Sequence, residues 1–162
     1  MKKCVFAGTF DPPTVGHEDV VNVCAKMFDK VYVAVLDNPQ KKTLFTTEQR
    51  AYLLNKLFSG RPEVEVVTFS GAAVDLLDRL GTPFYVRGVR DAIDFEYENR
   101  NHYASKRLKP DMISVYIPSE QRNLHVSSTL VKNSVKFGKN YDDLVPSAIL
   151  ADVKSMMEDK NV

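Results

Sequence analysis

The 162 residues are enough for one domain with a core of its own, and their 44% hydrophobic content is ordinary for a globular protein. A net charge of +1 gives no general attraction to nucleic acid or to an acidic membrane, so any anion site must be local. We therefore expect a single domain spanning residues 1–162, with neither a nucleic-acid partner nor a membrane partner.

Five short runs rich in apolar, β-branched and aromatic residues recur along the chain. They are KCVFA (3–7), VYVAVL (31–36), VEVVTF (64–69), FYVRG (84–88) and ISVYI (113–117). Each carries apolar residues on both faces, which is typical of a strand inside a parallel sheet. The sequence therefore predicts five strands.

Helical patterns separate and follow these runs. We predict helices over residues 16–28, 47–58, 72–80, 92–108, 127–137 and 146–159. Thr46 and Gln49 have capping-box spacing at the start of the second, and Gly138 is well placed to end the fifth. Strand–helix alternation predicts an α/β fold: a Rossmann-like, doubly wound, five-stranded parallel sheet with helices on both faces.

The two cysteines and the N-terminus bear on the compartment. Cys4 and Cys24 fit no CxxC or zinc-ligand spacing, so we expect buried, reduced thiols. Only about four apolar residues follow the lysines of MKKCVFAGTF, too few for a signal-peptide core. These features favour a cytoplasmic protein.

Ligands of such sheets bind outside the carboxyl ends of the strands, where the strand order reverses. That rule selects four loops, at residues 8–17, 37–46, 87–98 and 118–129. In the first, GTFDPPTVGH, Gly8 permits a sharp turn, and His17 lies at a helix start whose N–H groups and dipole favour phosphate. A tight turn with a solvent-facing histidine is the alternative at this point.

GTFDPPTVGH also resembles the (T/H)-x-G-H signature of the nucleotidylyltransferase superfamily, with Thr14 and His17 at its ends. In the longer form G-(S/T)-F-D-P-x-T-x-G-H it is similar to the bacterial phosphopantetheine adenylyltransferases. That family transfers AMP from ATP to 4′-phosphopantetheine, giving dephospho-CoA and pyrophosphate in coenzyme A biosynthesis. The resemblance covers essentially the whole chain.

Three further segments resemble the same family, in order and at family-like spacing. RGVRDAIDFEYE (87–98) is similar to R-G-x-R-x-x-x-D-F-E-Y-E, DNPQKKTLFT (37–46) to N-P-x-K-x-x-x-F-(S/T), and HVSSTLVK (125–132) to I-S-S-(S/T)-x-(V/I)-(R/K). By chemistry alone the alternatives are a surface Arg/Glu network, a solvated lysine pair and plain helix caps.

The resemblance implies three catalytic residues. His17 would stabilise the transition state, Lys41 would draw the attacking phosphate close, and Arg90 would hold ATP phosphates; Lys42 replaces Lys41 if the loop register differs. The implied ATP contacts are Thr9, Phe10, His17, Gly88, Val89, Arg90, Glu98, Asn123, Leu124, His125, Val126, Ser127, Ser128 and Thr129. The implied acceptor contacts are Thr9, Lys41, Ala73 and Arg87.

The implied reaction needs no general base, because the attacking phosphate is already ionised near pH 7, and positioning and charge stabilisation remain as the protein's task. No carboxylate cluster suggests a metal held by the protein alone, so we expect Mg²⁺ to be held mainly by the ATP phosphates. The resemblance also implies feedback inhibition by CoA and a homohexamer. Candidate subunit contacts are Tyr97, Tyr103 and Leu108.

The chain departs from the family pattern in three places. Val15 replaces a usual Asn, Ala7 replaces a usual Pro, and PSEQRNLHVSST (118–129) is one residue longer, which leaves the register of contacts from 122–126 open. His102 is expected to be a surface side chain. Alternative functions are adenylylation of nicotinate mononucleotide, CMP transfer, or nucleotide binding without turnover; the chain is too short for an aminoacyl-tRNA synthetase core.

Overall fold

The fold is built on one sheet of five strands, seen here in a computed structural model that describes residues 1–160. The strands are β1 (Lys3–Gly8), β2 (Lys30–Leu36), β3 (Val64–Phe69), β4 (Phe84–Val89) and β5 (Ile113–Pro118). All neighbours pair in parallel in the order β3-β2-β1-β4-β5. The five predicted strands are confirmed to within one residue at each end.

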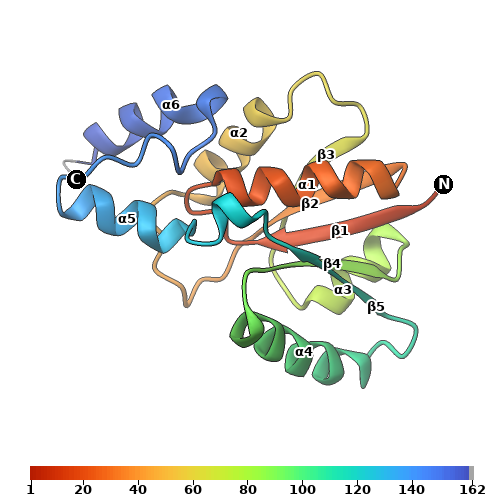
Figure 1. Cartoon of the computed structure of the whole chain (residues 1–162). Coiled ribbons are helices and arrows are strands. Elements are labelled where there is room, and N and C mark those ends of the chain that lie inside the picture. Colours follow the sequence, from red (N-terminus) through yellow and green to blue (C-terminus); the bar gives the residue numbers. More distant parts are fainter. Residues whose placement is uncertain (161–162) are drawn as a thin grey trace.

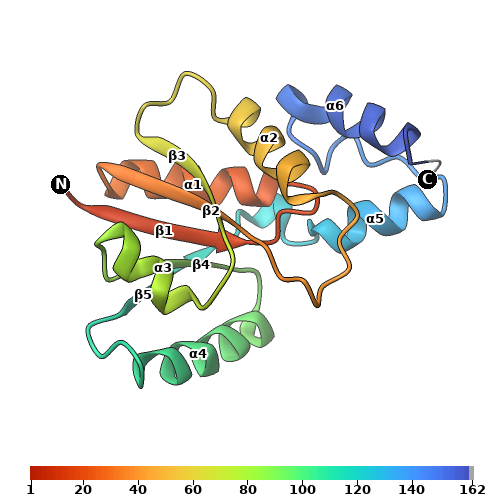
Figure 2. The same cartoon turned by 180° about the vertical axis from the view of Figure 1, so that it is seen from behind.

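Helices cover both faces of this sheet, as predicted. They are α1 (Val15–Met27), α2 (Thr47–Leu57), α3 (Ala73–Leu80), α4 (Ala92–Lys106), α5 (Ser128–Lys136) and α6 (Ser147–Glu158). Figures 1 and 2 show α1 and α2 on one face, α3 and α4 on the other, and α5 and α6 beyond the carboxyl ends of the strands. A short 3-10 helix, Gln121–Asn123, is the one described element that the sequence did not predict.

The core has three parts. One lies between the sheet and α1 and α2, a second lies under α3 on the opposite face, and a third joins α2 to α5 and α6. Helix α4 differs, since none of its side chains is buried. It contacts the sheet mainly through polar and aromatic side chains, including Glu98 with Arg87 on β4 and Phe95 with Tyr116 on β5.

Capping residues lie at the helix ends where the sequence predicts them. Thr46 and Gln49 form the predicted capping box of α2. Gly138, with a φ of 62°, lies just after α5, and the next residue, Lys139, donates its N–H to the Ser134 carbonyl at 2.7 Å. Cys4 and Cys24 are free and fully buried. Across residues 1–160, no helix is long and apolar enough to span a bilayer.

Candidate active site

A cavity of about 330 Å³ opens at the carboxyl end of the sheet, between β1 and β4, where the strand order reverses. This is the place that parallel-sheet topology predicts for a ligand. Three of the four predicted loops contribute to its wall. The lining residues that were predicted as site residues are Phe10, His17, Arg87, Gly88, Arg90, Glu98, Val126, Ser127 and Ser128.

His17 is held in the wall of this cavity by the start of α1. Thr14 is the N-cap, and its backbone N–H donates to Nδ1 of His17 at 3.0 Å. The imidazole also meets the edge of the Phe10 ring, with centroids 4.8 Å apart. Because Nδ1 accepts a hydrogen bond, the proton of the neutral ring sits on Nε2, which is left to serve a ligand.

The environment keeps this imidazole uncharged at neutral pH. Burial lowers the pKa of His17 from its ordinary value of 6.5 to about 4, and the nearby positive charge of Arg90 contributes in the same direction. His17 can therefore donate a hydrogen bond through Nε2–H as a neutral ring.

Stability should depend on pH through His17. The unfolded chain protonates this histidine near pH 6.5 and the folded chain only near pH 4, so stability is lost as the pH falls through that window. The loss amounts to at most about 3 kcal/mol. We expect the difference in the free energy of unfolding between wild type and His17→Gln to shrink by up to that amount from pH 7 to pH 4, measured by urea unfolding. Parallel stability curves for the two proteins would contradict the lowered pKa.

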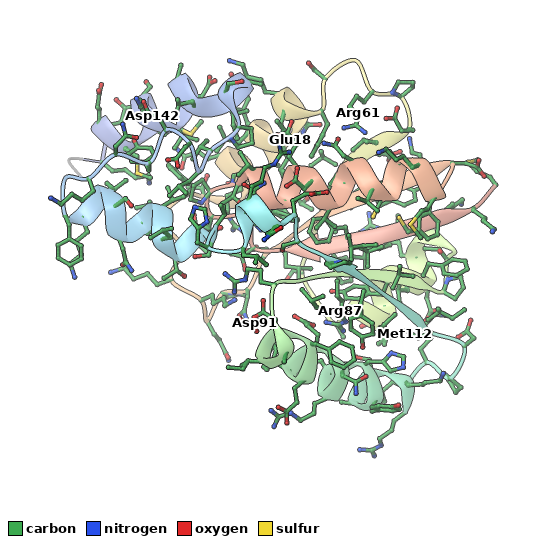
Figure 3. All side chains as sticks on the ribbon, viewed as in Figure 1. Glu18, Arg61, Arg87, Asp91, Met112 and Asp142 are labelled. Atoms are coloured by element: carbon green, nitrogen blue, oxygen red, sulfur yellow. The ribbon has the colours of Figure 1, made fainter. Side chains whose placement is uncertain are left out.

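Two arginines from the end of β4 lie in the same wall, each paired with a carboxylate of α4. Arg90 Nε donates to Asp94 at 2.9 Å, which lowers the pKa of that carboxyl group. Arg87 Nη1 donates to Glu98, and its guanidinium stacks on the Tyr85 ring at 4.5 Å. Figure 3 shows Arg87 in the space between the sheet and α4. Glu98, which the resemblance implies as an ATP contact with an Arg/Glu network as the alternative, is paired with Arg87 in this structure.

The start of α5 forms the opposite side of the cavity. Ser127 caps the helix, because its Oγ accepts from the Leu130 N–H at 3.0 Å. Ser128 Oγ donates to the Pro12 carbonyl at 2.8 Å, which joins α5 to the first loop. The capping alternative is therefore confirmed for Ser127, and it leaves N–H groups of the first turn free of helical partners.

The fourth loop, residues 37–46, reaches the site through one lysine. Lys41 Nζ donates to Thr9 Oγ1 at 3.4 Å, next to the cavity residues Gly8 and Phe10. Lys42 is exposed and has no recorded hydrogen bond among the described residues. The structure therefore brings Lys41, rather than Lys42, to the first loop.

Several predicted contacts lie outside the cavity lining: Val89, Asn123, Leu124, His125, Thr129 and Ala73. The Asn123 amide donates to Asp19 on α1 at 2.5 Å, whereas Leu124 and His125 are exposed. Ala73 packs into the core under α3. His102, expected at the surface, is half-buried, with its Nδ1 2.8 Å from Ser114 Oγ on β5.

Sequence reasoning missed several residues of the site. Asp94 follows Arg90 by four residues, and this spacing, typical of an ion pair along a helix, could have predicted their pairing. Tyr85 and Ser119 line the cavity without any sequence signal of their own. Asp11 and Arg50 carry charge in the interior, which becomes visible only in three dimensions.

Two residues that depart from the family pattern pack against apolar clusters. Val15 packs against the apolar cluster of α5 and α6, and its N–H donates to the Leu144 carbonyl at 3.0 Å. Ala7 lies in β1 and packs on the core under α3. Both positions thus receive apolar contacts from elements that follow much later in the chain.

Comparison with known proteins agrees with this geometry. A model of the cytidylyltransferase-like family matches residues 5–134, so the chain is a nucleotidyltransferase of the cytidylyltransferase-like class. Relatives named phosphopantetheine adenylyltransferase include that of Nautilia profundicola, 38% identical over 93% of this chain and 98% of its own. Another, from Clostridium beijerinckii, is 39% identical over 96% and 98%. The chain belongs to the phosphopantetheine adenylyltransferase family.

Proposed function

We propose that the protein transfers AMP from ATP to 4′-phosphopantetheine, releasing pyrophosphate and forming dephospho-CoA. One observation carries this proposal: a single cavity gathers a neutral histidine donor, Arg90 and the serine-rich start of α5, with Lys41 and Thr9 at its edge. Those are the groups that a triphosphate and a phosphate monoester require when they are bound side by side, and the relatives' names give phosphopantetheine as the acceptor of an adenylyl group.

In the proposed mechanism, an ionised oxygen of the acceptor phosphate attacks the α-phosphorus of ATP. The new P–O bond forms as the bond to the β-phosphate oxygen breaks, and pyrophosphate leaves with that electron pair. Nε2–H of His17 donates to an oxygen whose charge grows at the α-phosphorus. Lys41 orients the attacking phosphate, and Arg90 with the N–H groups of α5 holds the departing phosphates.

Arg87 is proposed to serve the acceptor. Its side chain is only 10% exposed, and its Nε is buried without a partner among the described residues. Leaving a buried N–H of a charged group unpaired is costly, so a ligand oxygen that reaches it gains a favourable contact. The carboxylate of Glu98 holds the guanidinium in place for that contact.

We propose that Mg²⁺ enters with ATP. Within residues 1–160, no group of three metal-ligating side chains gathers at one point. The cavity's own carboxylates, Glu98 and Asp94, are paired with arginines, which leaves phosphate oxygens and water as the better ligands. Bound in that way, the ion would neutralise part of the charge on pyrophosphate.

Pyrophosphate release tests the function directly. ATP and Mg²⁺ are supplied with 4′-phosphopantetheine, with nicotinate mononucleotide, or with no acceptor, and CTP replaces ATP in a parallel series. We expect release that depends on both ATP and 4′-phosphopantetheine, with dephospho-CoA identified by mass. Turnover with nicotinate mononucleotide or CTP would favour the other superfamily activities, and no turnover would favour a binding domain.

We also propose that the protein is a cytoplasmic homohexamer of one-domain subunits. The apolar residues of the α4 region have little to cover them within one chain: Ile93, Tyr97, Tyr103 and Leu108 are between 61% and 78% exposed. Large apolar side chains exposed together on one segment are typical of protein contacts. The two free, buried thiols suit a reducing compartment.

If the subunits assemble through α4, charged substitutions on this helix should disrupt the assembly. Tyr97→Glu combined with Tyr103→Glu should shift the sedimenting species from six chains to fewer, because carboxylates would be buried at the contact. Met27→Glu, at an exposed apolar residue at the end of α1, is the matched control and should leave assembly unchanged. An unaltered hexamer in the α4 variant would place the contact elsewhere.

A further inference from the structure

We infer that Arg50 and Asp11 are positioning residues that fix residues 37–46, and with them the Lys41 ammonium, beside the first loop. Both are charged, both are only 2% exposed, and neither lines the cavity. The inference rests on the function proposed above for Lys41. It concerns how that lysine is held, since Arg50 and Asp11 reach no substrate themselves.

Arg50, on α2, connects three separate stretches of chain. Its Nη1 donates to the Thr9 carbonyl at 2.8 Å and to the Leu36 carbonyl, at the end of β2, at 3.2 Å. Its Nε donates to the Phe45 carbonyl at 3.1 Å. One guanidinium thus ties both ends of the 37–46 loop to the residue that receives Lys41. A lysine could not do this, because it lacks the planar set of five N–H donors.

Asp11 holds the end of the same loop through its backbone N–H groups. Its two carboxylate oxygens accept the backbone N–H groups of Leu44 at 2.7 Å and Phe45 at 2.8 Å. Lys132 of α5 lies 3.4 Å away and offsets the charge. Burial of a carboxylate is costly unless such donors satisfy it, so the site strongly specifies the position of the loop.

Between its two anchored ends, at Leu36 and at Leu44 and Phe45, the loop has little support of its own. Residues 37–42 are exposed. Asp37 donates its N–H to the Phe69 carbonyl of β3 at 2.8 Å, and beyond it the hydrogen bonds are local, to Asn38, apart from Lys41 to Thr9. A lysine side chain is flexible, so the backbone under it decides how often its ammonium reaches Thr9. A displacement of about 1 Å at a reacting group can cost about 100-fold in rate.

A double-mutant cycle tests the inference. Arg50→Lys keeps the charge but loses the fork, and it should lower kcat/KM for 4′-phosphopantetheine about 10- to 100-fold, with KM for ATP nearly unchanged. In the Lys41→Ala background the same substitution should cost less than about 3-fold, because the group it positions is gone. Asp11→Asn, which keeps the shape but withdraws one acceptor, should repeat the pattern and carries the cycle if Arg50→Lys does not fold.

Asp152→Asn is the matched control. It breaks the 2.6 Å ion pair between Asp152 on α6 and Lys56, which lies on α2 as Arg50 does, and it leaves both loops unchanged. Its kinetics should equal wild type. Equal losses from Arg50→Lys in both backgrounds would refute the positioning role, as would a loss confined to KM for ATP. A folded wild-type protein that releases no pyrophosphate would instead refute the proposed function.

Discussion

Replacing His17 by alanine is expected to lower kcat about 10²–10³-fold, the usual cost of removing one donor to a developing oxyanion. The neutral ring has its proton on Nε2, because Nδ1 accepts from the Thr14 N–H. Alanine removes this donor and leaves the cavity walls in place. Steady-state pyrophosphate release, measured at saturating concentrations of both substrates, gives the value.

Alanine also removes an α1 cap contact, so stability should fall by about 1 kcal/mol, and folding must be checked by circular dichroism. His102→Ala is the control, since His102 is also half-buried with a lowered pKa but lies outside the cavity lining. The pKa of His17 in the free protein is about 4, so His17 itself should add no step to the pH profile of kcat/KM near pH 6.5. A folded His17→Ala enzyme with near-normal kcat would remove His17 from the mechanism.

Replacing Lys41 by alanine is expected to lower kcat/KM for 4′-phosphopantetheine about 100-fold, while KM for ATP changes little. The ammonium lies 3.4 Å from Thr9 Oγ1, where it can bridge the first loop and an incoming phosphate. Removing it withdraws both a charge and a positioning contact from the acceptor. Initial rates over a grid of the two substrate concentrations separate these constants.

Lys42→Ala is the matched control, because it deletes the same charge one residue away on the same exposed loop. It should stay within about twofold of wild type, since scattered surface charges contribute little. The reverse result, with Lys42 essential and Lys41 dispensable, would show that the loop takes another register when substrates bind.

Much of the fold could be predicted because its signals are local. Apolar runs marked the five strands to within one residue, and the helical patterns marked the six main helices to within two. Strand–helix alternation then predicted a parallel sheet, and in such a sheet the ligand site is expected in the loops at the carboxyl ends of the strands. Three of those four loops line one cavity.

The pairing of charged groups could not be predicted in the same way. The block RGVRDAIDFEYE contains two arginines and several carboxylates, and sequence spacing alone left the role of Glu98 open. The pair of Arg90 and Asp94 has a local four-residue spacing, but Arg87 pairs with Glu98 only because α4 turns back over the end of β4. Partner choice depends on how two elements cross, which local periodicity does not encode.

The sequence by itself determined the elements, the sheet and the loops that carry the chemistry, because backbone hydrogen bonding and apolar periodicity act over a few residues. The tertiary structure alone decided that His17 is neutral, that Lys41 rather than Lys42 meets Thr9, and that Val15 belongs to the apolar cluster of α5 and α6. The burial of Arg50 and Asp11 belongs with these, since each binds residues more than 30 positions away. Burial and electrostatic environment arise from such distant contacts, which exist only once the chain has folded.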